Sequence, residues 1–168
     1  MSLRSGTFVA VGGTIGTFGR RVLARKLGPM IVDHGLELLS EEAARQLLAG
    51  AEVGRVGICI GALPAIFPVN YRLIDGAIVF WTSPGSKMSA ATEGAVVAFE
   101  VDDYQLADRS GWSVLAVGRA EVVTDPDMAA RVEATCLQPF VDGRRDTLVR
   151  IEPTFLSGRR LVHGDLSR

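Results

Sequence analysis

The chain has 168 residues, a formal net charge of −1 at pH 7 and a hydrophobic content of 48%. Its length predicts one domain with a buried core, and the near-balanced charge excludes the basic surface on which nucleic-acid binding depends. No apolar run reaches the roughly 18 residues that a membrane-spanning helix needs. Because no export signal stands out either, we expect a cytoplasmic protein.

Residues 1–34 differ in character from the rest of the chain. Residues 8–19 (FVAVGGTIGTFG) resemble the first strand and turn of a dinucleotide-binding domain, but their glycines do not form the G-x-G-x-x-G pattern. No strand with a ribose-binding acid follows, and the glycines also interrupt any signal-peptide core. We therefore expect residues 1–34 to form a poorly ordered extension, with Met30 as an alternative start. Residues 35–168 are expected to form the domain.

The domain begins with a predicted helix over residues 41–49, for which Ser40 is a suitable N-cap. Strands are predicted over residues 55–62, 65–73 and 77–82, with a turn at Leu63-Pro64 between the first two. Asp75-Gly76 separates the last two strands, and this dipeptide tolerates the positive φ angles of a two-residue hairpin turn.

The second half of the domain continues the pattern of short strands. A short helix over residues 87–93 and a second helix from Asp125 to Cys136 are predicted, and a loop is expected from Asp102 to Gly111. Strands are predicted over residues 95–101, 112–123 (with a bulge at Gly118) and 147–156. This order favours a mostly β fold, an antiparallel barrel with short flanking helices, over alternating βαβ units.

Cysteines and histidines are few and do not form a metal-binding pattern. Cys59 and Cys136 lie far apart in apolar surroundings and are expected to be buried thiols. His34 and His163 are the only histidines, so no zinc-ligand spacing exists, and a haem would depend on a single axial histidine.

The loop that follows the strand at residues 77–82 is a candidate anion site. Its sequence, SPGSK, offers small residues that let backbone N–H groups approach an anion, together with the hydroxyl of Ser86 and the charge of Lys87. A plain hairpin-exit loop fits the same residues. In the strand predicted over residues 65–73, Pro68 has no N–H donor and suits an edge or bulge, where neighbouring backbone groups can bond a planar ligand. A half-exposed polar pair on a strand would explain Asn70 and Tyr71 equally well.

Four segments of the chain follow one another in a characteristic order and spacing: GRVGICIGALPAIFPVNYRLIDGAIVFWTSPGSKMSAA, VAFEVDDYQ, GWSVLAVGRAEVV and LVRIEPTFLSGRRL. Together they resemble the flavin-binding split-barrel family of pyridoxamine 5′-phosphate oxidase and its relatives. The resemblance covers about three quarters of the chain and excludes residues 1–34. It implies a six-stranded antiparallel split barrel that forms a homodimer, with FMN in a groove between the subunits.

The resemblance also implies roles for particular residues. Pro68, Val69, Asn70 and Tyr71 would run beside the isoalloxazine ring, mainly through backbone groups, and Trp81 and Thr82 would lie by the ring and ribityl chain. Ser86 and Lys87 would hold the phosphate. Trp112 and Ser113 would contribute from across the dimer interface. A structural role in the core is the alternative reading of both Trp81 and Trp112.

Departures from the family pattern argue against pyridoxamine phosphate as the substrate. Phe67 stands where vitamin B6 oxidases carry an arginine, although Arg72 keeps a later charge, and Lys87-Met88 replaces an Arg-Lys pair. The C-terminal Arg-x-His motif is matched only by RLVH, ending at His163, which is one residue out of step.

The sequence therefore predicts an FMN-binding oxidoreductase acting on an unidentified small molecule. The flavin would carry the chemistry, so no side-chain nucleophile is required. A deazaflavin-dependent reductase of the same fold and a non-catalytic flavin- or haem-binding protein remain as alternatives.

Overall fold

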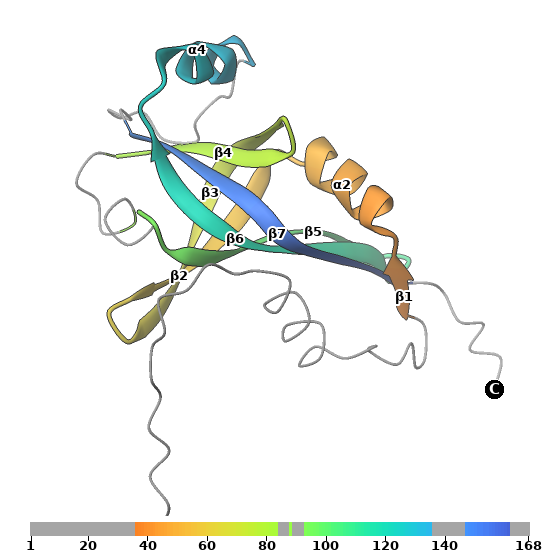
Figure 1. Ribbon diagram of the computed structural model, residues 1–168. Coiled ribbons are helices and arrows are strands. Elements are labelled where there is room, and N and C mark those ends of the chain that lie inside the picture. The colour runs from red at the N-terminus through yellow and green to blue at the C-terminus, as the bar shows by residue number, and fades with distance from the viewer. Residues whose placement is uncertain (1–35, 84–87, 89–92, 136–146, 162–168) are drawn as a thin grey trace, which may run out of the picture. The chain divides into compact units, whose positions relative to one another are not determined.

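The computed structural model describes residues 36–83, 88, 93–135 and 147–161 (Figure 1). The expected extension 1–34, most of the predicted helix 87–93, Cys136 and both histidines lie outside the described residues. Within these residues the helices are α2 (Glu41–Gly50), which begins after the predicted N-cap Ser40, and α4 (Pro126–Ala134), for which Asp125 is the N-cap. The strands are β1 (Leu36–Leu39), β2 (Val53–Ile60), β3 (Leu63–Ile74), β4 (Ala77–Thr82), β5 (Val96–Gln105), β6 (Ser110–Val123) and β7 (Thr147–Leu161).

All strand pairings are antiparallel, and six strands close into a barrel. The sheet order is β1-β7-β4-β3-β2-β5-β6, and a further pairing of β6 with β7 closes the circuit. The predicted split barrel is thus confirmed. Strand β1 is not among the predicted strands; it adds to the end of β7 through the register Leu36 opposite Leu161 and Leu39 opposite Gly158.

Two hairpin turns set the registers of the β2–β3 and β3–β4 ladders. Asp75 and Gly76 adopt φ angles of 52° and 80°, as expected for the predicted two-residue turn between β3 and β4. The turn expected at Leu63-Pro64 is wrong: Ile60 pairs with Leu63, so the chain reverses at Gly61-Ala62. Gly61 has a φ of 63°, a conformation that costs glycine little.

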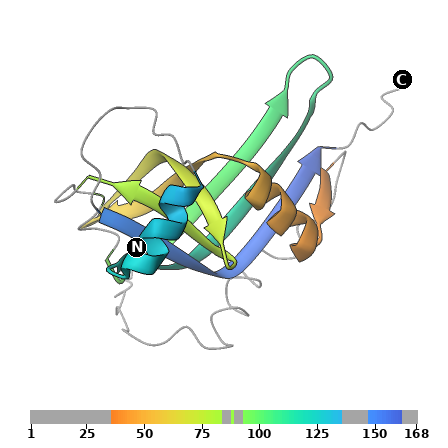
Figure 2. The ribbon, with the colours of Figure 1, turned by 90° about the horizontal axis from the view of Figure 1, so that it is seen from above.

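Strands β5 and β6 extend beyond the barrel as a twisted hairpin arm (Figure 2). The loop expected from Asp102 to Gly111 is therefore wrong, because ladder pairing continues from Asp102 opposite Ser113 to Gln105 opposite Ser110. We call the part of this hairpin that spans residues 102–113 the β5–β6 arm.

The irregularity predicted at Gly118 lies where β6 crosses β7. Val117 pairs with Phe155 and Gly118 with Pro153, so the register skips Thr154. The Thr154 hydroxyl donates to the Val117 carbonyl at 3.2 Å. A Cβ at position 118 would lie 2.0 Å from the Glu152 carbonyl oxygen, so only glycine fits this close crossing. The β7 strand continues through Pro153.

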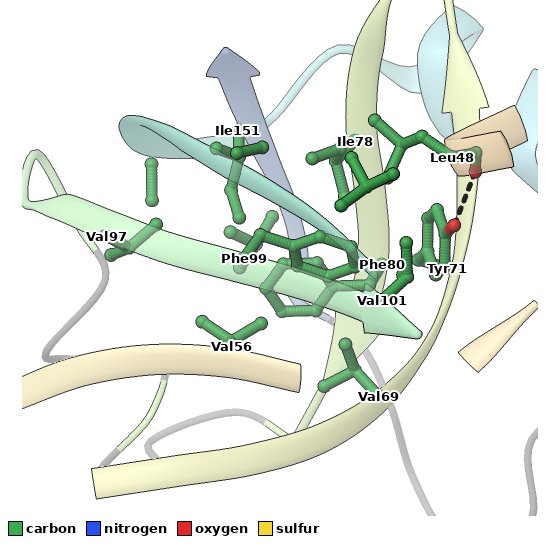
Figure 3. Packing of buried hydrophobic residues seen from close by; sticks show 14 of the residues in the cluster. Leu48, Val56, Val69, Tyr71, Ile78, Phe80, Val97, Phe99, Val101 and Ile151 are labelled. Atoms are coloured by element: carbon green, nitrogen blue, oxygen red, sulfur yellow. Dashed lines mark hydrogen bonds between the residues drawn. The ribbon is translucent and has the colours of Figure 1, made fainter. Parts of the chain in front are cut away.

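Alternate residues of the barrel strands fill the interior (Figure 3). The rings of Tyr71 and Phe99 meet edge to face, with centroids 4.8 Å apart and planes at 71°. The Tyr71 hydroxyl donates to the Leu48 carbonyl and thereby connects β3 to α2 (Figure 3). Burial raises the pKa of Tyr71, so the ring remains neutral.

A second cluster lies beneath α4. Val132 of α4 packs with Ile74, Val79 and Leu148. Arg131 of α4 binds Asp75 in a bidentate pair with distances of 2.8 and 3.0 Å, which ties the helix to the β3–β4 turn.

The expectation of a buried thiol at Cys59 is wrong. Cys59 is exposed because β2 and β3 run past the end of the barrel as a hairpin, although its apolar neighbours suggested a core position. Among the described residues, no helix is long and apolar enough to cross a membrane. The same part of the chain contains no group of three or more His, Cys, Asp or Glu that could hold a metal ion.

Candidate functional site

Strands β3 and β4 separate at the place where the candidate flavin-contacting residues lie. Their ladder runs from Ile74 opposite Ala77 to Tyr71 opposite Phe80, where it ends. Beyond this point β3 continues along β2 through residues 63–70, and β4 continues along β7 to Thr82. We call this divergence the β3–β4 split. It brings together six sequence-predicted residues: Pro68, Val69, Asn70, Tyr71, Trp81 and Thr82.

Side chains on the two sides of β3 have different surroundings at the split. Val69 and Tyr71 point into the barrel, where Val69 is 8% exposed and Tyr71 is fully buried (Figure 3). Pro68 and Asn70, by strand alternation, lie on the outer face. The Tyr71 side chain therefore belongs to the core. Any contact of this residue with a ligand would be made by its backbone, as the resemblance implies.

Trp81 and Thr82 continue β4 past the last pair with β3. Thr82 is buried at 4% exposure. Trp81 is half-buried and packs against the second cluster beneath α4, which gives it a structural role.

Trp112 and Ser113 lie apart from these six residues, on the β5–β6 arm. Ser113 pairs with Asp102 on one side and Arg159 on the other. Both Trp112 and Ser113 line a groove of about 310 Å³, and Trp112 also packs against the main core. We call it the arm groove; its other lining residues are Leu36, Glu100, Asp102, Asp103, Tyr104, Arg159 and Leu161.

Arg55 connects the outer face of β3 with the arm groove. It stands opposite Pro68 in one ladder and opposite Glu100 in the other. Its guanidinium donates to Glu100 at 3.0 Å and also to Asp102. The hydrogen bond and charge of Asp102 raise the pKa of Arg55. Burial and the charge of Asp102 raise the pKa of Glu100 in spite of the Arg55 contact.

Sequence reasoning did not identify Arg55, Glu100, Asp102 and Arg159 as neighbours. The spacing of Glu100 and Asp102 already places both carboxylates on one face of a strand. The pairing of β5 with β2 and β6 was needed to show which cation they meet.

The predicted phosphate ligands Ser86 and Lys87 lie outside the described residues. The two other positions compared with the family pattern are described. Phe67 packs against the main core. Arg72 donates to the Tyr71 carbonyl and to Glu52, both at 3.1 Å.

A split barrel of this topology, with its strands parted at the candidate residues, defines a class of protein that the sequence comparisons identify. The sequence profile described as pyridoxamine 5′-phosphate oxidase matches residues 40–160, and the chain belongs to this family.

The chain is also similar to known proteins in sequence and in structure. The uncharacterised protein Rv0080 of Mycobacterium tuberculosis is 40% identical over 144 residues, which cover 83% of this chain and 93% of that protein. A solved FAD-binding protein from Mycobacterium smegmatis is 30% identical with a TM-score of 0.67, covering 76% of this chain and 100% of its own. A Corynebacterium diphtheriae protein of unknown function, DIP1874, is 28% identical with a TM-score of 0.64, covering 77% and 100% respectively.

Proposed function

We propose that this protein is a flavin-binding oxidoreductase that holds its cofactor at the β3–β4 split and acts as a homodimer on a small molecule. The single observation that carries the proposal is the end of the β3–β4 ladder at Tyr71 and Phe80, in a chain that belongs to this family. At the split β3 stays paired with β2 and β4 stays paired with β7, so neither strand is broken. The backbone edges of β3 at Pro68 and Val69 and of β4 at Trp81 are no longer paired with each other. A planar heterocycle with donors and acceptors at its edge suits such a place.

The residues at the split fit a flavin in defined ways. Pro68 and Asn70 on the outer face would lie beside the ring, while Val69 and Tyr71 are fixed by the core beneath it. Trp81 and Thr82 would border the ring and the ribityl chain, and Ser86 and Lys87 would bind the phosphate. A bound flavin supplies hydride and electron transfer, and the protein's part is to bind, orient and exclude water.

FMN is the form of the cofactor that we propose. The similar M. smegmatis protein binds FAD, so FAD is the competing form. Both contain the same ring and ribityl phosphate, and FAD carries an additional adenosine monophosphate group on that phosphate.

The proposed homodimer rests on apolar side chains of the β2–β3 hairpin. Leu63 is 74% exposed and Ile66 is 71% exposed, and Val53, at the other end of β2, is also exposed. A second copy that covers this hairpin would remove apolar surface from water. Trp112 and Ser113 would then complete the cofactor site of the partner.

The first experiment is the absorption spectrum of the freshly purified protein, followed by chromatography of the released cofactor. Flavin bands with FMN in the extract are expected. FAD in the extract would change the form of the cofactor, a Soret band would support the haem-binding alternative, and a deazaflavin would support the related reductase. Protein that stays colourless and binds neither riboflavin nor FMN would contradict the proposal.

A matched titration tests the phosphate contact. Lys87→Ala should weaken FMN about tenfold to a hundredfold, because a charge-assisted hydrogen bond contributes roughly 1.5–3 kcal/mol. Riboflavin lacks the phosphate, so its affinity should hardly change, and it serves as the control ligand. Equal small effects on both ligands would remove Lys87 from the site.

Sedimentation at micromolar concentration tests the dimer. We expect the mass of two chains for the wild type and a shift toward the monomer for Leu63→Glu/Ile66→Glu, which places charges on the apolar hairpin. Cys59→Ser, an exposed change on the same hairpin that adds no charge, is the control. A wild-type protein of monomer mass would contradict the proposed assembly.

A further inference from the structure

Arg159 of β7 lines the arm groove and is a half-buried cation without a bonded partner. Among the described residues four arginines are half-buried, and three of them pair with a glutamate, whereas Arg159 makes no hydrogen bond or ion pair in this part of the chain. A charge that is partly removed from water and left unpaired is suited to meet an anionic group from outside its own chain. The three pairs are Arg45–Glu41, Arg72–Glu52 and Arg150–Glu152.

The neighbours of Arg159 in the sheet leave its charge uncompensated. It stands between Ser113 of β6 and Leu38 of β1, which are both uncharged. Asp102 lies beyond Ser113 on the next strand, where it binds Arg55, as Glu100 also does. These two carboxylates are therefore engaged by a different arginine.

Arg159 lies far from the β3–β4 split of its own chain. At the split Trp81 pairs with Leu148, and roughly 35 Å of extended strand leads along β7 from Leu148 to Arg159. Across the sheet through β2, β5 and β6, four strand spacings separate β3 from β7, or about 19 Å. An arginine side chain spans neither path, so a flavin that Arg159 reaches is one held by another chain.

The proposed homodimer supplies that second chain. The proposed function assigns Ser113 to the cofactor site of the partner. Arg159 is the ladder partner of Ser113, so the two side chains stand on the same face with Cβ atoms about 5 Å apart. A two-fold dimer uses the same patch of both chains, so each arm groove would meet the split of the other chain. Arg159 would then lie beside the same cofactor as Ser113.

A flavin carries negative charge at two places. Its phosphate is charged in every redox state, and the proposed function assigns this group to Ser86 and Lys87 of the chain that holds the ring. The oxidised ring is neutral. Two electrons and one proton, which bonds to N5, convert it to a reduced ring whose negative charge lies over N1 and the C2 carbonyl. The ring edge is thus the anionic group that still lacks a cation.

From these observations, and resting on the proposed function, we infer that Arg159 of each chain contacts the N1–C2 edge of the flavin in the other chain. Its planar guanidinium can donate to the ring nitrogen and the carbonyl oxygen together. The contact strengthens when the ring becomes negative, so Arg159 raises the reduction potential of the flavin. The arm groove is in this way a part of the cofactor site.

Reductive titration of the flavin-loaded protein against a reference dye tests the inference. Arg159→Gln should weaken binding of the reduced flavin about tenfold relative to the oxidised flavin, which lowers the midpoint potential by about 30 mV for a two-electron couple. Arg159→Met, which keeps the apolar stem, should give the same shift, and Arg159→Lys should restore part of it. Potentials equal to that of the wild type in both neutral variants would overturn the inference.

Riboflavin separates the ring edge from the phosphate. It lacks the phosphate, so its potential should shift in Arg159→Gln as much as that of FMN. A loss of FMN affinity that riboflavin does not share would make Arg159 a phosphate ligand and overturn the inference.

Arg160→Gln is the matched control. Arg160 is the next residue of β7, is exposed and faces the other side of the strand. Its loss removes the same charge and should leave the potential unchanged. An equal shift in this control would show that net charge sets the potential, which would overturn the inference.

Two further measurements separate this inference from the proposed function. A protein that binds flavin but keeps its potential in the Arg159 variants contradicts the inference alone. A protein that binds no flavin contradicts the proposed function, and the inference falls with it. A shifted potential in a protein that sediments as a monomer would overturn the contact between chains.

Discussion

Strands β5 and β6 pass through both the closed barrel and the β5–β6 arm, and their side chains change character at the boundary. Within the barrel, Val97, Phe99 and Val101 are buried and alternate with more exposed neighbours. From Asp102 to Arg109 every residue is exposed. The barrel part is thus held by packing and the ladder together, whereas the arm is held mainly by its ladder and by contacts at its base. Side-chain packing is therefore concentrated in the barrel part of the same two strands.

The largest expected difference between the two regions comes from removing an apolar side chain. Phe99→Ala should lower the free energy of unfolding by about 3–5 kcal/mol, because a fully buried ring is lost from the main core. Leu106→Ala, at the tip of the arm, removes a side chain that is 82% exposed and should change it by less than about 0.5 kcal/mol. Urea unfolding of both variants measures the contrast. Similar losses would show that the arm tip packs against something in solution.

Adding a methyl group to glycine should sharpen the same comparison. Gly118→Ala places a Cβ 2.0 Å from a backbone oxygen of the neighbouring strand and should cost about 2–3 kcal/mol. Gly111→Ala meets the Tyr104 ring and the Asp103 carbonyl at 2.8 Å. This change should cost about 1 kcal/mol, since the exposed arm can shift. Thermal unfolding measures both variants, and a larger loss of stability for Gly111→Ala than for Gly118→Ala would contradict this distinction.

The buried hydroxyl of Tyr71 offers a smaller test within the barrel. Tyr71→Phe keeps the ring but leaves the Leu48 carbonyl without this donor, so stability should fall by about 1–2 kcal/mol. Flavin affinity should be unchanged, because the side chain points into the core. A large loss of flavin binding with little loss of stability would place the hydroxyl in the cofactor site instead.

The smallest effect is expected at the ion pair between α4 and the β3–β4 turn. Arg131 lowers the pKa of Asp75, so this pair stabilises the fold above the ordinary pKa of an aspartate and ceases to do so as the pH falls and Asp75 is protonated. Arg131→Ala should therefore be slightly less stable than the wild type at pH 7, and this difference should vanish in acid. Melting temperatures between pH 7 and pH 3 measure it. A difference that grows as the pH falls would contradict the assignment.

The sequence predicted the barrel well and the arm poorly, and burial explains the contrast. Apolar residues such as Val97, Phe99 and Val101 alternate with more exposed residues where one face of the strand is buried. The Asp75-Gly76 dipeptide is itself typical of a hairpin turn. Over residues 102–109 both faces are exposed, so Asp102, Asp103 and Tyr104 show no alternation and resemble a loop.

Cys59 was misjudged for a related reason. Local composition indicates hydrophobic surroundings, but it does not reveal that a hairpin continues past the end of the barrel. Exposed apolar residues such as Leu63 then look like core residues.

The candidate site was predictable only as a set of residues on strands. The stretch from Pro68 to Tyr71 could be named from its order in the chain. The separation of β3 from β4 at Tyr71 depends on where their ladder stops. The contact of Arg55 with Asp102 depends on pairings between segments that are distant in sequence. No local pattern carries this information.

The long β7 strand has a consequence for how the protein is made. Its first part pairs with β4 and its last part with β1, while β6 accompanies it along nearly its whole length. These partners are spread over the described chain, so most of the contacts of β7 are non-local, which slows folding. During synthesis the barrel has no closing strand until residues 147–161 have left the ribosome. Until then the edges of β4 and β6 stay open, and the nascent chain is vulnerable to edge-to-edge association.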